Sequence, residues 1–276
     1  MSSPKVYGLI GWPLGHSMSP KMHNAAFKAL GMNAEYKLFP MAPQYLDNFL
    51  ARLDNSGISG LNVTIPYKEK ILDFVELDES SLYLRQVRAV NTIITRGGVW
   101  WGYNTDIPGF ARHLKQNFNP LNKKAAILGA GGACRAVAYV LAKENAAEIY
   151  IYDLDRSKSL EISMMVKRIF PRARIFPVES VERLDIKNKD LLVNATPVGL
   201  KNTDPLLVEE GMLHKGLFVY DLIYNPVQTK LLALAEKNGL KNSNGLGMLL
   251  YQGMLSFEIW TGKKAPEEVM RLALAA

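Results

Sequence analysis

Short apolar runs recur along the chain, each closed by glycine, proline or asparagine, and longer segments of helical character lie between them. Such runs indicate strands, and strands that alternate with helices are typical of an α/β fold. In the first part of the chain the pattern predicts strands over 6–11 and 34–39, a third strand from residue 60 up to Pro66, helices over 20–30, 44–53 and 108–118, and a hairpin turn at Gly97-Gly98.

Beyond residue 120 the alternation of strand and helix continues. An apolar run over 125–128 leads into a glycine-rich turn and a helix over 136–145, and further strands are predicted over 148–152, 174–177, 191–195 and 217–222. Strands joined in this way pair in parallel, so we expect a doubly wound sheet of the Rossmann type. Two more helices, over 249–261 and 266–275, follow this sheet.

Length and composition favour two domains in an α/β protein. The chain has 276 residues, of which 48% are apolar, enough for two packed cores. The net charge of +7 comes from scattered Lys and Arg residues with no basic stretch interleaved with aromatics, so we expect no nucleic-acid partner. No apolar run approaches the ~20 residues needed to span a bilayer. A single cysteine does not indicate whether the protein resides in an oxidising or a reducing compartment. We expect a cytoplasmic protein without a membrane partner.

The glycine-rich turn is the strongest motif for a ligand. Gly129, Gly131 and Gly132 follow a strand and precede a helix, an arrangement that lets the backbone approach a pyrophosphate and directs helix N–H groups at it. Cys134 stands where the third glycine of the fingerprint belongs, so the motif alone also fits an ordinary loop. Asp153, about 20 residues on and directly after a strand, is placed to bind the ribose hydroxyls. We therefore expect a dinucleotide here.

Other polar positions remain open between a structural and a chemical role. Ser17 and Ser19 precede a helix and could cap it, or hold a carboxylate. His16 and His23 lack a third ligand nearby, so we expect no metal site. Lys68 could be an ordinary surface cation, which is the commonest role of a lysine.

Two further polar residues are equally ambiguous. Asn91 could pair with backbone, and Asp106 could cap the helix that follows it. Spacing alone does not choose between these roles and a catalytic partnership with Lys68.

Taken together, these segments resemble the shikimate dehydrogenase family over nearly the whole chain. Several independent motifs occur in one order, which makes a chance match improbable. The matching segments are 11–13, 16–20, 23–24, 62–68, 89–92, 102–106, 129–133, 194–197, Asp221 with Tyr224 and Pro226, and Gly245 with Tyr251 and Gln252.

The resemblance implies the domain organisation and the roles of the polar residues. It implies a substrate-binding and catalytic domain made of residues 1–107 and 246–276, and a dinucleotide-binding domain over 108–245. Lys68 would be the general acid and base, and Asp106 its charged partner. Ser17 and Ser19 would hold the substrate carboxylate. The other substrate contacts would be Asn62, Thr64, Asn91, Tyr224 and Gln252.

The resemblance also implies hydride transfer between a nicotinamide dinucleotide and a small-molecule substrate, 3-dehydroshikimate or shikimate. Members of the family mostly use NADP and carry uncharged and basic groups after the second strand of the nucleotide domain. Here Asp153 stands there and would repel a 2′-phosphate, so we expect NAD to be preferred, with NADP as the second choice. The expected cofactor-binding residues are Gly129, Ala130, Gly131, Gly132, Ala133, Asp153, Asp155, Arg156, Thr196, Leu222 and Gly245.

Three other functions compete with a shikimate dehydrogenase. A quinate dehydrogenase tends to vary the serine pair, whereas Ser17 and Ser19 are both serine here. A non-catalytic sensor would have lost Lys68 or Asp106. A methylene-tetrahydrofolate dehydrogenase shares some of the architecture, but the Ser17 and Ser19 loop speaks for the shikimate family. The sequence leaves open whether the protein is a monomer or a homodimer.

Overall fold

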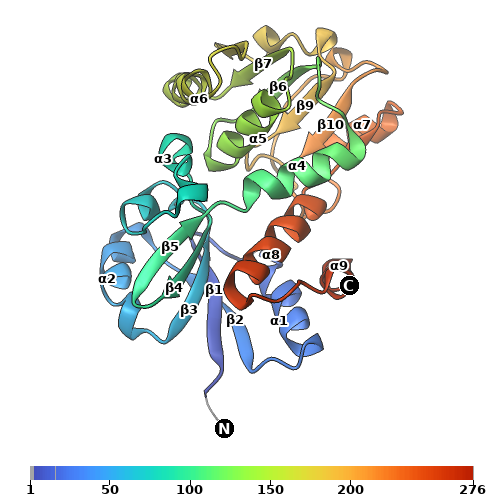
Figure 1. Cartoon of the computed structure of the whole chain (residues 1–276). Coiled ribbons are helices and arrows are strands. Elements are labelled where there is room, and N and C mark those ends of the chain that lie inside the picture. Colours follow the sequence, from blue (N-terminus) through green and yellow to red (C-terminus); the bar gives the residue numbers. More distant parts are fainter. Residues whose placement is uncertain (1–2, 16, 276) are drawn as a thin grey trace. The chain divides into compact units, whose positions relative to one another are not determined.

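The structure of the chain is a computed structural model that describes residues 3–15 and 17–275. It divides into two compact units, the first comprising Met1–Gly109 and Leu249–Ala276, and the second comprising Phe110–Met248. The first unit is thus built from two separate stretches of the sequence. Figure 1 shows its strands in blue to green and its last helices in red.

The first unit contains a five-stranded mixed sheet in the order β2-β1-β3-β4-β5. β1 pairs in parallel with β2 and β3, and β4 runs antiparallel to both β3 and β5. β4 and β5 form the predicted hairpin, in which Gly97 and Gly98 have φ of 60° and 77°. The strands are β1 (Lys5–Gly11), β2 (Ala34–Pro40), β3 (Ile58–Val63), β4 (Thr92–Arg96) and β5 (Val99–Tyr103).

The helices of the first unit come from both stretches of the chain. α1 packs against α9 and against β2, although α1 and α9 are far apart in sequence. The predicted helix over 44–53 is interrupted, because its two ends adopt 3-10 turns and only Leu46–Ala51 is α-helical. The helices are α1 (Ser19–Ala29), α2 (Leu46–Ala51), α3 (Leu84–Val87), α8 (Leu246–Thr261) and α9 (Glu267–Ala275), with α4 (Asp106–Asn117) beginning at Asp106.

The second unit contains six parallel strands in the order β8-β7-β6-β9-β10-β11. The order reverses between β6 and β9, which confirms the doubly wound sheet expected from the sequence. Strand β11 was not predicted because it has only two residues. The elements are β6 (Lys124–Leu128), α5 (Gly132–Lys143), β7 (Glu148–Tyr152), α6 (Arg156–Ile169), β8 (Ile175–Val178), β9 (Leu191–Asn194), β10 (Phe218–Asp221), α7 (Lys230–Lys237) and β11 (Asn242–Ser243).

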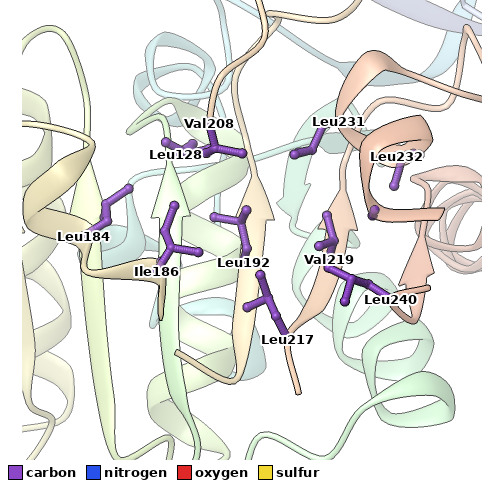
Figure 2. Close-up of a cluster of buried hydrophobic side chains, with 12 residues drawn as sticks. Leu128, Leu184, Ile186, Leu192, Val208, Leu217, Val219, Leu231, Leu232 and Leu240 are labelled. Atoms are coloured by element: carbon purple, nitrogen blue, oxygen red, sulfur yellow. The ribbon is translucent and has the colours of Figure 1, made fainter. Parts of the chain in front are cut away.

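One face of this sheet is covered by a hydrophobic cluster (Figure 2). Leu128, Leu192 and Val219 come from three neighbouring strands, and Leu231 and Leu232 come from α7. All five side chains are at most 3% exposed. The cluster packs against β6 and β9. The order of the strands reverses between these two neighbours.

An aromatic cluster fills part of the core of the first unit. The His23 ring of α1 stacks on Tyr36 of β2 at 4.5 Å between centroids, and Trp260 of α8 lies 5.2 Å from His23. His23 is fully buried, and neither ring nitrogen has a hydrogen-bond partner within the described part of the chain. Burial lowers its pKa from 6.5 to about 3, because the charged ring would lose its hydration.

Within residues 3–15 and 17–275, every helix is too short or too polar to cross a bilayer.

Leu192→Ala should destabilise the second unit by about 2–5 kcal/mol, because it removes a fully buried side chain and leaves a cavity in the cluster of Figure 2. Leu154→Ala serves as the control, since Leu154 is 94% exposed and its truncation should leave the melting temperature within about 1 °C. Chemical denaturation and thermal melts measure both. Equal stability of the two variants would contradict the assignment of this core.

His23 should make the protein less stable in acid. Below pH 6.5 the unfolded chain binds a proton at His23, whereas the folded chain does not until about pH 3, so stability is full above pH 6.5 and falls as the pH drops. The loss over this window should approach the order of 5 kcal/mol. His23→Phe should flatten the decline of melting temperature between pH 6.5 and 4. An unchanged slope in this variant would show that carboxyl groups alone cause the decline.

Candidate active site and dinucleotide site

The candidate active site lies at one edge of the first sheet. β4 runs antiparallel to β3, and β5 runs antiparallel to β4, so β3 ends at the edge where β4 begins and β5 ends. The cross-strand pairs of Asn62 with Thr92 and of Thr92 with Tyr103 mark this edge. Three loop segments that are distant in sequence therefore meet there. Lys68 and Asn91 lie in two of these segments, and Asp106 follows the third as the first residue of α4.

The structure brings Lys68 and Asp106 into direct contact. Lys68 Nζ lies 2.6 Å from Asp106 Oδ2, and the two side chains are 12% and 9% exposed. The Lys68 carbonyl accepts a hydrogen bond from Val90 N at 2.9 Å, which ties the lysine loop to the strand next to it. A pair that is largely removed from water has a stronger mutual attraction than a surface pair. The ammonium is thus held at one point of the edge.

Asp106 is not needed to cap the helix that it begins. The Asn104 side chain accepts a hydrogen bond from Ile107 N at 3.0 Å and donates one to the Ala89 carbonyl at 2.7 Å. Asn104 therefore satisfies the first turn of α4, and the carboxylate of Asp106 is left for Lys68. The structure thus pairs Asp106 with Lys68, and the catalytic partnership of the two residues stays a prediction.

Asn91 and Gln252 lie beside this pair, in a buried polar network. Asn91 Nδ2 donates to Thr105 Oγ1 at 2.9 Å, and Asn91 Oδ1 accepts from Thr105 N at 2.7 Å. Gln252 on α8 donates to the Leu249 carbonyl at 2.9 Å. The two carboxamides are 3% and 8% exposed, so each is almost entirely enclosed by protein.

Asn62 is held by hydrogen bonds within the protein. Its Oδ1 accepts from the Tyr36 hydroxyl at 2.8 Å, and its Nδ2 donates to Thr92 Oγ1 at 3.1 Å and to Ser256 Oγ at 2.9 Å. The polar atoms of this side chain, which is 5% exposed, are thus already bonded within the protein. In this structure Asn62 joins β3 to β4 and α8, and its expected contact with the substrate stays a prediction.

Ser17 and Ser19 lie at the start of α1. Ser17 Oγ accepts a hydrogen bond from Ser19 N at 3.3 Å, and the Ser19 side chain is buried. The capping role is therefore seen for Ser17, while its half-buried hydroxyl keeps the capacity to donate. Thr64, also half-buried, follows β3 directly. His16 lies outside the described residues, and no group of three His, Cys, Asp or Glu suited to a metal ion occurs among those residues.

The glycine turn of the second unit has the form of a pyrophosphate site. Gly129 has φ of 92°, and a Cβ there would lie 2.8 Å from the Thr196 methyl group, so the turn after β6 packs closely on the turn after β9. Gly131 precedes α5, no side chain caps this helix, and a Cβ on Gly131 would meet no atom within 4 Å. The first backbone N–H groups of α5 have no partner within the helix, and the start of a helix favours a phosphate.

The acidic turn after β7 is occupied by bonds within the chain. Asp153 Oδ2 accepts from Ala130 N at 2.6 Å, and Asp153 Oδ1 accepts from Asp155 N at 2.8 Å. Asp155 caps α6 by accepting from Ser157, and the hydrogen bonds of Ser157 lower the pKa of Asp155. Arg156 is exposed and lies 2.9 Å from Glu179. Exposed pairs of this kind are weak, so Arg156 is available to an anion.

The remaining expected residues lie at the ends of β9 and β10 and in the loop before α8. Thr196 donates to Asn194 Oδ1 at 2.7 Å and accepts from Val198 N at 3.1 Å, so its hydroxyl shapes the turn after β9. Gly245 approaches the Leu222 carbonyl so closely that a Cβ would lie 2.0 Å from the oxygen. Tyr224 belongs to this second unit, in the loop after β10, whereas the other expected substrate contacts belong to the first unit.

Sequence reasoning missed the hydroxyl groups that hold the active-site edge together. Thr92, Thr105 and Ser256 form mutual contacts of 2.9 to 3.3 Å and are at most 2% exposed. Ser256 lies four residues after Gln252 on one helix face, a spacing that could have suggested a shared environment. Thr105 carried no signal other than its place between Asn104 and Asp106.

Comparison with known proteins identifies the family. The shikimate dehydrogenase substrate binding domain matches residues 9–93, and the shikimate 5'-dehydrogenase C-terminal domain matches residues 245–274. The shikimate dehydrogenase (NADP(+)) of Methanopyrus kandleri is 46% identical over 277 residues, covering 98% of this chain and 94% of the relative. The crystal structure of shikimate dehydrogenase from Aquifex aeolicus has a TM-score of 0.90 at 34% identity, covering 100% of this chain and 99% of that chain.

A further crystal structure, of a shikimate dehydrogenase in complex with NADP+, has a TM-score of 0.89 at 38% identity and covers 99% of this chain and 95% of that chain. Together with the name of the Methanopyrus kandleri relative, it shows that the expected preference for NAD is wrong and that NADP is favoured. The structure provides the physical reason. Both oxygens of Asp153 are engaged by backbone N–H groups, and Arg156, three residues further on, is an exposed cation.

The sequence relationship and the structural similarity both extend over almost the entire chain. The chain belongs to the shikimate dehydrogenase family, whose members are oxidoreductases that act on a CH–OH group.

Proposed function

We propose that this protein is an NADP-dependent shikimate dehydrogenase, which interconverts 3-dehydroshikimate and shikimate. The observation that carries the proposal is the contact of 2.6 Å between Lys68 Nζ and Asp106 Oδ2 in two largely buried side chains. A lysine held in this way can exchange a proton with a substrate oxygen at a defined point. The names of the relatives support shikimate as the small-molecule substrate.

Lys68 and Asp106 divide the work of proton transfer. When bound, NADP supplies or accepts the hydride at its nicotinamide. As the substrate carbonyl oxygen gains charge, the Lys68 ammonium donates a proton to it, and in the reverse direction the neutral amine takes the proton back from the hydroxyl. Asp106 does not touch the reacting oxygen in this scheme. It holds Nζ in place through the contact of 2.6 Å.

The other expected substrate residues surround the ring. Ser17 and Ser19 bind the carboxylate by donating from their hydroxyl groups at the start of α1. Asn91 and Gln252 donate hydrogen bonds to the substrate hydroxyls, and Thr64 contributes a third polar group. Tyr224 of the second unit contacts the substrate as well.

NADP binds to the second unit. The turn from Gly129 to Ala133 holds the pyrophosphate against the start of α5, because the N–H groups there lack partners within the helix and a Cβ on Gly131 would meet only open space. Arg156 binds the 2′-phosphate, since its guanidinium is exposed and an Arg can bind phosphate in a bidentate manner.

A cytoplasmic location and the choice between monomer and homodimer stay predictions.

The purified protein should oxidise shikimate with NADP, with a kcat/KM that exceeds the value for NAD. A spectrophotometric assay that crosses shikimate and quinate with the two cofactors measures this directly. Arg156→Ala should raise the KM for NADP about tenfold and leave the KM for NAD unchanged, because only NADP carries the 2′-phosphate. Arg168→Ala, at the opposite end of α6, is the matched control. A higher kcat/KM for quinate would assign the protein to the other substrate of this chemistry.

Lys68→Ala should lower kcat by about 10² to 10⁴, the usual contribution of a placed proton donor. The dissociation constant of NADP, measured by fluorescence, should stay within about twofold, because the proposed role of Lys68 is proton transfer to the substrate and not binding of the dinucleotide. Lys70→Ala is the matched control, since Lys70 lies two residues further on, is half exposed and pairs only with Asp47 among the described residues. Retention of more than about half of the wild-type turnover in Lys68→Ala would refute the catalytic role.

A further inference from the structure

Thr105 lies directly before Asp106, is 2% exposed, and directs its polar atoms at neighbouring side chains of the site. Its backbone N–H donates to Asn91 Oδ1 at 2.7 Å, and its hydroxyl accepts from Asn91 Nδ2 at 2.9 Å. The same hydroxyl lies 3.4 Å from Gln252 Oε1, to which it can donate. One residue thus contacts both carboxamides of the site.

The orientation of the Asn91 carboxamide follows from these contacts. A backbone N–H can only donate, so the atom of Asn91 that faces Thr105 N must be the oxygen. The nitrogen is thereby directed at Thr105 Oγ1, which accepts one of its two hydrogens. Its second hydrogen has no partner among residues 3–15 and 17–275, and it is the group that Asn91 can offer to a ligand.

The orientation of Gln252 follows in the same way. A backbone carbonyl can only accept, so the atom that faces the Leu249 oxygen at 2.9 Å must be Nε2. Oε1 then faces the Thr105 hydroxyl. The oxygen of each carboxamide thus faces a donor of Thr105, with Thr92 Oγ1 as a second donor to Asn91 Oδ1 at 3.2 Å. Each carboxamide keeps one N–H for a ligand.

We propose that Thr105 is a positioning residue of the substrate site, which aligns the amide groups of Asn91 and Gln252 so that each presents an N–H donor to a substrate oxygen. The proposal rests on the proposed function and deepens it. It implies that this part of the site recognises acceptors, namely the oxygens of hydroxyl or carbonyl groups on the substrate ring. The contribution of Thr105 is made through the two amides, with no contact to the substrate.

Ser256 provides a matched control within the same cluster. Its hydroxyl lies 3.1 Å from Thr105 Oγ1 and is just as buried, but it bonds to Asn62, to Thr92 and to the backbone carbonyl of Gln252 rather than to either of the two carboxamides. A change at Ser256 therefore perturbs the packing of the cluster without releasing the amide groups of Asn91 or Gln252.

The test compares Thr105→Val, Thr105→Ser and Ser256→Ala in steady-state assays of shikimate oxidation at saturating NADP. Thr105→Val keeps the shape and removes the hydroxyl, and we expect it to raise the KM for shikimate about five- to tenfold, the usual effect of one lost neutral hydrogen bond. The KM for NADP should be unchanged. Thr105→Ser should restore the KM to within about twofold of the wild type. Ser256→Ala should lower the melting temperature while leaving the KM for shikimate within twofold.

The KM is independent of the folded fraction, so a merely structural role would lower the apparent kcat and leave the KM alone. An unchanged KM in Thr105→Val, a KM raised equally by Ser256→Ala, or failure of Thr105→Ser to restore the KM would each overturn the proposal. If Thr105→Val does not fold, Thr105→Ala is read by the same criteria. If the wild-type protein does not turn over shikimate at all, the proposed function fails first, and the two failures are thereby distinguished.

Discussion

Buried polar groups must find hydrogen-bond partners, and this requirement governs the edge of the first sheet. Parallel and antiparallel strands meet there, so several strand ends and polar side chains are buried at one place. Leaving one such group unpaired costs about 1–3 kcal/mol. The network around Asn62, Asn91 and Thr105 avoids that cost, since each buried amide is bonded to hydroxyl or backbone groups. The same bonds that stabilise the edge also orient the groups left over for a ligand.

The order of strands and the glycine turn could be predicted from the sequence because they depend on local patterns. The spacing of apolar residues and the positions of glycine and proline identified the strands of the doubly wound sheet, apart from the two-residue β11. The strand β7 was predicted with its observed bounds. The start of α5 was placed four residues late, because Gly132 and Ala133 were assigned to the turn alone. The helix around α2 was overextended, because an amphipathic pattern does not show where 3-10 turns replace α-helical ones.

The roles of polar residues were harder to predict, since each depends on partners that are distant in sequence. The contact between Lys68 and Asp106 spans 38 positions, and only the resemblance to a family suggested it. The hydrogen bond from Asn62 to Ser256, 194 positions away, could not be predicted either, because nothing local in the sequence indicates it. Asp153 misled for the same reason: its carboxylate is bonded to Ala130, 23 positions earlier, and a carboxylate engaged by the backbone is poor evidence on the charge of a cofactor.

The discontinuous first unit has a consequence for synthesis on the ribosome. Strands β1 to β5 emerge early, yet Asn62 and Thr92 find Ser256 only after the whole of the second unit has been made. Domains that are continuous in sequence fold as the chain emerges, so the second unit can complete its core while the first still waits for α8. During that interval the indole of Trp260 is missing from the ring cluster around His23 and Tyr7, and the nascent sheet exposes apolar surface of the kind that chaperones bind.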